Sequence, residues 1–321
     1  MNKLRRLIPL TALAGAAALT LTACGNDAAG TTSDGKLKVT ASFYPMEFLA
    51  EQIGGDHVDV TTLTKPGTEP HDLELTPRQT AELAGSGFIL YLKNVQPAVD
   101  EAIKQSGVEN VLEASTLTTL EKTGTTEDGH DHTEDAADDG HGHDDENGLD
   151  PHIWIDPVRY AEVAEGVGAA LAKADPANAA DYKANAAKLT ARLGDLDQKF
   201  KDGLANKKTD TFITTHAAFG YLADRYGLVQ EAIKGLDPES EPSAKRVQQL
   251  HEVAEHDGVR TVFFETLVSD KTAKTLAGDL GLKTDVLDPL EGITDQSKGD
   301  DYFAVQEANL QALQKALGAT A

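Results

Sequence analysis

The chain has 321 residues, with 29 lysines and arginines against 53 aspartates and glutamates, and its formal net charge is −24. So acidic a chain argues against a nucleic-acid partner and against a protein that lies flat on anionic lipid, because both surfaces would repel it. The part that follows residue 35 is longer than one hydrophobic core usually holds, which favours two domains.

The N-terminus has the pattern of an export signal. A basic head precedes an apolar run over residues 7–21, which is too short and wrongly flanked for a stable membrane span. The only cysteine, Cys24, follows Leu-Thr-Ala at the cleavage point, and this resembles the lipobox of bacterial lipoproteins, whose cysteine thiol is acylated. We therefore expect a lipoprotein signal peptide over residues 1–23, a lipid on Cys24 and a flexible tether over residues 24–35.

The first folded region alternates between strand and helix patterns. The segments are, in chain order, 38–43 (strand), 46–53 (helix), 58–63 (strand), 76–83 (helix), 88–92 (strand) and 108–112 (strand), with a further helix before the last. This alternation predicts a parallel sheet with crossover helices. We place this N-terminal α/β lobe at residues 36–174.

Residues 121–148 interrupt that alternation, because they are polar and acidic with almost nothing apolar. Four histidines lie among these carboxylates, at His130, His132, His141 and His143. Their spacing suits chelation, but a flexible segment must lose conformational entropy to enclose an ion. We therefore expect a disordered surface loop with weak, accessory metal sites; a solubilising charged segment is the alternative.

The second half of the chain begins with helical patterns and then returns to alternation. A helix ending near residue 174 is followed by an unusually long one over residues 176–204, roughly 40 Å at about 1.5 Å per residue. We expect a linker helix at 175–206 and a C-terminal α/β lobe at 207–321. Its segments are strands at 211–215, 261–264 and 284–287, with helices at 243–256, 271–280 and 301–317. The predicted fold is α/β, with two lobes, each a mainly parallel sheet flanked by helices, joined by one long helix.

Three of the six remaining histidines stand where a strand or a chain reversal leads into a helix: His71, His152 and His216. Ligands of open α/β sheets bind beyond the carboxyl ends of the strands, which favours His216 in particular. A lone histidine at a turn is more often a cap or a surface residue, so the pattern alone leaves both interpretations open. The other three are interpreted as structural or solvated: His57, His251 and His256.

Four short motifs occur in one order and together resemble a known family. They are Gly67-Thr68-Glu69-Pro70-His71-Asp72-Leu73-Glu74, Asp150-Pro151-His152-Ile153-Trp154, Thr215-His216-Ala217-Ala218-Phe219-Gly220-Tyr221 and Asp288-Pro289-Leu290-Glu291-Gly292. The chain is similar to the zinc-binding lipoproteins of bacterial metal-uptake ABC transporters, within the zinc/manganese cluster of solute-binding proteins. The resemblance covers the exported N-terminus and residues 36–318.

The resemblance implies one metal ligand on each motif: His71, His152, His216 and Glu291. Asp288 is the alternative to Glu291, with water or Glu69 as further ones. Manganese members of the family resemble this chain at the first two positions but carry a carboxylate at the third, where this chain has His216. Three imidazoles and one carboxylate suit a tetrahedral zinc ion, whereas manganese prefers more oxygen ligands.

The resemblance also implies a function. We expect a monomeric lipoprotein on the outer face of the bacterial cytoplasmic membrane, which captures Zn²⁺ and delivers it to an ABC permease and, through it, to the transport ATPase. No enzymatic activity is expected. One alternative is a secreted zinc hydrolase with Glu291 as general base, although the chain has no His-Glu-x-x-His motif. The other is a surface adhesin that binds zinc structurally.

Overall fold

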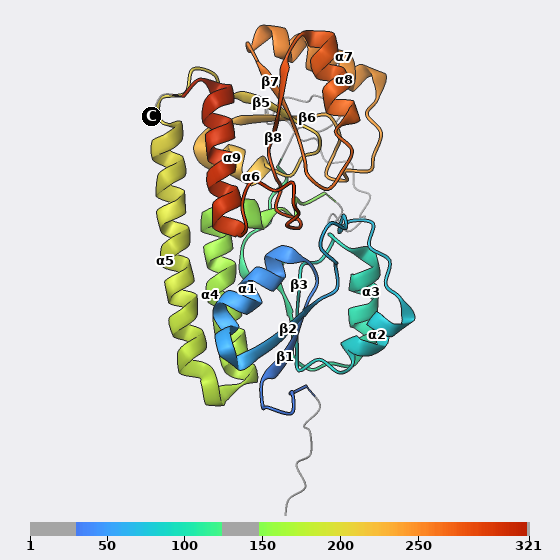
Figure 1. The fold of residues 1–321 in the computed structure, drawn as a ribbon, viewed down its shortest axis with the longest axis vertical. Coiled ribbons are helices and arrows are strands. Elements are labelled where there is room, and N and C mark those ends of the chain that lie inside the picture. Colours follow the sequence, from blue (N-terminus) through green and yellow to red (C-terminus); the bar gives the residue numbers. More distant parts are fainter. Residues whose placement is uncertain (1–29, 124–147, 320–321) are drawn as a thin grey trace, which may run out of the picture.

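The computed structural model describes residues 30–123 and 148–319, which form two α/β lobes beside a pair of long helices (Figure 1). Each lobe contains one four-stranded parallel sheet. The predicted fold class is confirmed. The residue limits drawn above for the signal, tether, lobes and linker remain predictions.

The first sheet has the strand order β2-β1-β3-β4. Its strands are β1 (Leu37–Ala41), β2 (Val58–Thr62), β3 (Phe88–Tyr91) and β4 (Val111–Glu113), and its helices are α1 (Tyr44–Gly54), α2 (Pro77–Leu83) and α3 (Pro97–Ser106). Alternate residues of β3 face opposite sides, as the period of a strand requires. Phe88 and Leu90 join the core under α1, whereas Ile89 joins the smaller core under α2 and α3.

The second sheet repeats this arrangement, with the order β6-β5-β7-β8. Its strands are β5 (Thr211–Thr214), β6 (Val229–Ala232), β7 (Thr261–Phe264) and β8 (Lys283–Val286), and its helices are α6 (Gly220–Tyr226), α7 (Ala244–His256), α8 (Lys271–Leu280) and α9 (Tyr302–Leu317). Ile213 and Val262 pack under α7 and α8, whereas Phe212 and Phe263 join the main core on the other face. Short helical turns complete the chain at Gly55–His57, Ala114–Leu117, Ile153–Ile155 and Pro176–Asn178.

The predicted linker helix corresponds to α5 (Ala179–Leu204), which is antiparallel to α4 (Pro157–Ala174) along one side of both lobes (Figure 1). It contacts α1 in the first lobe and α9 in the second. Its apolar face is buried at Tyr182, Leu189, Leu193, Leu196 and Phe200. Because the same helix packs on both lobes, it fixes their spacing. Within the described ranges, no helix is long and apolar enough to cross a membrane.

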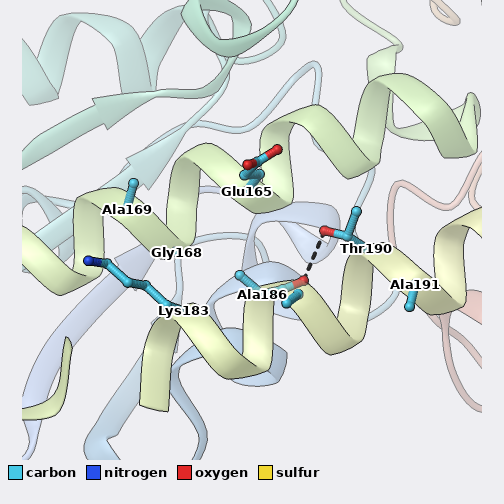
Figure 2. Close-up of a pocket in the computed structure, with 8 residues that line it drawn as sticks. Glu165, Gly168, Ala169, Lys183, Ala186, Thr190 and Ala191 are labelled. Atoms are coloured by element: carbon cyan, nitrogen blue, oxygen red, sulfur yellow. Dashed lines mark hydrogen bonds between the residues drawn. The ribbon is translucent and has the colours of Figure 1, made fainter. Parts of the chain in front are cut away.

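Small residues bring α4 and α5 close together (Figure 2). A Cβ atom on Gly168 would lie only 2.5 Å from the Cβ of Ala186. Beside this contact the Thr190 hydroxyl donates a hydrogen bond of 2.9 Å to the Ala186 carbonyl (Figure 2). The two helices therefore form a closely packed pair along the side of the molecule.

Candidate metal centre

Four side chains from separate segments converge between the two lobes: His71, His152, His216 and Glu291. Each offers one ligand atom, and these atoms all lie within 4.8 Å of one another. Glu291 Oε1 lies 3.3 Å from Nε2 of His71, 3.5 Å from Nε2 of His152 and 3.3 Å from Nε2 of His216. The Nε2 atoms of His152 and His216 are 3.4 Å apart. The structure thus brings together the four residues that the resemblance selected.

Three of these residues follow the carboxyl ends of parallel strands, where ligands of open sheets bind. His71 lies in the loop after β2, His216 comes two residues after β5, and Glu291 lies in the turn after β8. His152 immediately precedes the short helical turn Ile153–Ile155 that leads into α4. The first lobe therefore supplies His71, the second supplies His216 and Glu291, and His152 comes from the segment between them.

The cluster is almost closed to solvent. The side chains of His152, His216 and Glu291 have no exposed area, and the His71 side chain is 11% exposed. His71 also lines a cavity of about 340 Å³ together with Asp100 and Asp237. Solvent therefore reaches the cluster at His71.

Burial and neighbouring charges shift the pKa values of the cluster in opposite directions. Burial lowers the pKa of His152, but Asp150 and Glu291 outweigh burial and the net pKa is raised. Burial also lowers the pKa of His216, yet Glu265 and Glu291 hold it well above the ordinary range. For Glu291, burial raises the pKa, but the three imidazoles, His216 foremost, bring it well below the ordinary range. Without a metal, the electrostatics of the cluster therefore favour the charged forms of His152, His216 and Glu291.

The turn that carries Glu291 is fixed by Asp288, the predicted alternative to Glu291 as a ligand. Asp288 Oδ1 accepts a hydrogen bond from the Leu290 backbone N–H at 2.8 Å, and Oδ2 accepts one from the Ser297 hydroxyl at 2.8 Å. Leu290 has a φ of 59°, a left-handed conformation that is costly for a branched side chain. Asp288 is not among the four clustered residues, because its oxygens hold this turn.

Glu69, the more distant alternative, lies beside the cluster without joining it. Burial and then the charge of Glu291 raise the pKa of Glu69 to about 7. Its Oε2 accepts a hydrogen bond of 3.3 Å from the Asp72 backbone N–H. The carboxyl group thus helps to shape the loop that carries His71.

The sequence profile of one protein family, described as zinc-uptake complex component A, periplasmic (ZnuA), matches residues 39–316. The chain belongs to this family. This confirms the resemblance identified from the four motifs.

Similar proteins agree with this assignment to the zinc-uptake family. Zinc-binding protein AdcA of Streptococcus pyogenes is 37% identical over 293 residues, which cover 88% of this chain and 56% of AdcA. The high-affinity zinc uptake system protein ZnuA of Bacillus subtilis is 34% identical over 308 residues, or 93% of this chain and 94% of that protein. The chain therefore spans little more than half the length of the AdcA proteins that it matches.

Solved structures share the fold. The Zn(II)-bound ZnuA-like domain of Streptococcus pneumoniae AdcA superposes with a TM-score of 0.71 at 32% identity, covering 88% of this chain and 99% of the domain. A laminin-binding protein of Streptococcus agalactiae, described as a bifunctional adhesin and metal transporter, has a TM-score of 0.74 at 28% identity, covering 87% of this chain and 99% of that protein.

Other residues singled out in the sequence lie elsewhere. His57 Nε2 is 2.8 Å from Asp181 Oδ2, and His256 Nδ1 is 2.7 Å from Asp257 Oδ1, both away from the cluster. His251 is not among the clustered residues either. Cys24 and the loop histidines fall outside the described residues: His130, His132, His141 and His143.

Sequence reasoning missed two carboxylates that contact the Nδ1 atoms of His152 and His216, on the side of each ring away from the cluster. Asp150 Oδ1 lies 2.7 Å from His152 Nδ1, and Glu265 Oε1 lies 2.7 Å from His216 Nδ1. Asp150 stands two residues before a candidate ligand, which is a usable signal. Glu265 follows β7 and is 49 residues from His216 in the chain, so only the pairing of β5 with β7 brings it near.

Proposed function

We propose that the protein captures one Zn²⁺ ion between its lobes, with His71, His152, His216 and Glu291 as ligands, and delivers it to an ABC permease. The observation that carries this proposal is the spacing of the ligand atoms. Zinc bonds of about 2.0–2.1 Å in a tetrahedron require ligand atoms roughly 3.3–3.4 Å apart. Of the six distances among the four ligand atoms, four lie between 3.3 and 3.5 Å, and all are within 4.8 Å.

The donor set favours zinc over harder cations. Three imidazole nitrogens and one carboxylate oxygen suit Zn²⁺, whereas Mg²⁺, Ca²⁺ and Mn²⁺ prefer more oxygen ligands and higher coordination. The ligands come from both lobes and from the segment between them, so a bound ion would hold the lobes together. The ion would enter past His71, since that is where the cluster is exposed, and two carboxylates of the adjoining cavity, Asp100 and Asp237, would attract it.

Four protein ligands leave no open position for a substrate or an activated water, which argues against the zinc hydrolase. The adhesin alternative draws on the laminin-binding neighbours, and no particular contact of the described residues favours it. We propose an extracytoplasmic monomer, anchored to the outer face of the cytoplasmic membrane by a lipid on Cys24. Its partners would be the permease and, through the permease, an ATPase.

Zinc titration of the protein without residues 1–24 tests this proposal. Binding followed by calorimetry and by the fluorescence of Trp154, whose ring centroid is 5.1 Å from that of His152, should reveal one tight site. His216→Ala should abolish the tight site, whereas His256→Ala, a change at an exposed histidine, should not. Deletion of residues 125–146 should also spare it. Tight binding that survives His216→Ala and is lost with the loop would overturn the proposal.

A further inference from the structure

Two buried carboxylates outside the cluster contact the far sides of two of its imidazoles. Asp150 has no exposed area and Glu265 is 4% exposed. Asp150 Oδ1 lies 2.7 Å from Nδ1 of His152 and also accepts a hydrogen bond of 2.8 Å from its backbone N–H. Glu265 Oε1 lies 2.7 Å from Nδ1 of His216. In both imidazoles, Nε2 faces the cluster and Nδ1 faces a carboxylate.

We propose that Asp150 and Glu265 are positioning residues for the metal, and that each keeps a proton on Nδ1 so that the Nε2 lone pair points into the cluster. This inference rests on the proposed function. A neutral imidazole carries one proton, and a carboxylate can only accept it. Each carboxylate therefore selects the tautomer that leaves Nε2 free to bind an ion. Its negative charge also makes Nε2 a stronger electron-pair donor to the metal.

Asp150 is itself fixed by contacts with Thr123 and with Tyr221 of the second lobe. Its Oδ2 accepts a hydrogen bond from the Thr123 hydroxyl, and its backbone carbonyl accepts one of 2.7 Å from the Tyr221 hydroxyl. Gly220, the first residue of α6, leaves the necessary space, because a Cβ there would lie 3.0 Å from Asp150 Oδ2 and closer still to Thr123. These contacts define the orientation of His152 before any ion arrives.

The surroundings of Glu265 are harder to explain by folding alone. Its Oε1 also accepts a hydrogen bond from the Thr215 hydroxyl, but its Oε2 is buried and makes no hydrogen bond. A buried carboxylate oxygen without a partner destabilises a fold. Such a cost is typical of residues kept for function, here the orientation of His216.

Zinc affinity measured in Glu265→Gln and Asp150→Asn tests the proposal. Each amide can donate to Nδ1 and so favour the tautomer with a proton on Nε2, which has to leave before an ion binds. We expect each variant to bind zinc about 10–100-fold more weakly than the wild type. Cobalt bound in place of zinc should show altered visible absorption bands, because the imidazoles are less firmly oriented.

Glu231→Gln is the matched control. Glu231 lies in the same lobe as Glu265, and its Oε2 is 2.6 Å from Arg246 Nη2, away from the cluster. The same substitution there should lower the melting temperature of the metal-free protein and leave zinc affinity and the cobalt spectrum unchanged. Wild-type affinity and spectra in both Glu265→Gln and Asp150→Asn would overturn the proposal.

The wild-type protein provides a test that does not depend on how any variant folds. With ¹⁵N-labelled histidine and zinc bound, His152 and His216 should each carry a proton on Nδ1 and bind zinc through Nε2. Zinc on Nδ1 of either residue would overturn the inference. The proposed function fails separately, if His216→Ala keeps wild-type zinc affinity. Loss of binding in His216→Ala with no loss in the two carboxamide variants would refute the positioning role alone.

Discussion

The indole Nε1 of Trp154 donates a hydrogen bond of 2.7 Å to the backbone carbonyl of Pro289, across 135 residues of sequence. Trp154 lies two residues after His152, and Pro289 lies two residues before Glu291. The Tyr302 hydroxyl donates a further bond of 2.7 Å to the Trp154 carbonyl. Two of the proposed zinc ligands are therefore joined through a buried contact that involves neither of their side chains.

Trp154→Phe should lower the free energy of unfolding by about 1–3 kcal/mol, because the buried Pro289 carbonyl loses its donor. Zinc affinity should fall with it, since the turn that carries Glu291 loosens. Urea unfolding and zinc titration measure the two effects. Tyr182→Phe removes a similar bond, of 2.7 Å to Asp175 at the end of α4, and should affect stability alone. Unchanged zinc affinity in Trp154→Phe would show that the contact does not support the metal centre.

The first lobe contributes one proposed ligand, so His71→Ala isolates its share of zinc binding. We expect affinity to fall by more than about 100-fold, beyond the range for residues that only orient ligands. The three remaining ligands should still hold an ion weakly, because contacts such as that of Trp154 with Pro289 keep them in place. His57→Ala, a change at another histidine of the same lobe, should leave affinity unchanged. Equal affinities in the two variants would contradict the assignment of His71.

The pKa shifts in the cluster predict how zinc affinity depends on pH. The pKa of His216 lies well above its usual range and that of His152 is also raised, so protons compete with zinc beyond the ordinary histidine range. Affinity should therefore keep rising as the pH increases above about 6.5. Calorimetry in buffers of different ionisation enthalpy should detect protons released on binding. Affinity that is level between about pH 6 and 8 would contradict this prediction.

The same shifts predict the stability of the metal-free protein. A histidine with a raised folded-state pKa stabilises the fold below the unfolded pKa of about 6.5, and this contribution disappears as the pH rises through the folded-state pKa. Glu291, with a lowered pKa, stabilises the fold above its unfolded pKa of about 4.3 and loses that contribution only in acid. The metal-free melting temperature should therefore decline as the pH rises above neutrality. The increase in melting temperature caused by zinc should grow over the same interval, and a constant increase would count against the charged cluster.

Much of this fold can be predicted from the sequence, because β3 and the buried face of α5 show clear periodicity. The strand β6 was missed because its Gln230 and Glu231 hide that signal. Gln230 is buried nonetheless, since its side-chain amide donates 2.8 Å to the Thr214 hydroxyl and its Oε1 accepts from the Phe219 backbone N–H at 3.1 Å. The order of the strands in each sheet could not be predicted either, because periodicity does not say which strands are neighbours. Glu265 was missed for that reason: its role exists only through the pairing of β5 with β7.

The contact between α4 and α5 predicts opposite effects for two glycines. Gly168→Ala should destabilise the protein by about 1–3 kcal/mol, because the new Cβ would lie 2.5 Å from that of Ala186 and the packed helices cannot easily separate. Gly194→Ala lies on the exposed side of α5, where the added Cβ would meet no atom within 4 Å other than the adjoining backbone of its own helix. It should stabilise the protein by about 0.5–1 kcal/mol through helix propensity. Urea unfolding measures both, and neither variant should change zinc affinity. If Gly168→Ala proves as stabilising as Gly194→Ala, the two helices are not in such close contact.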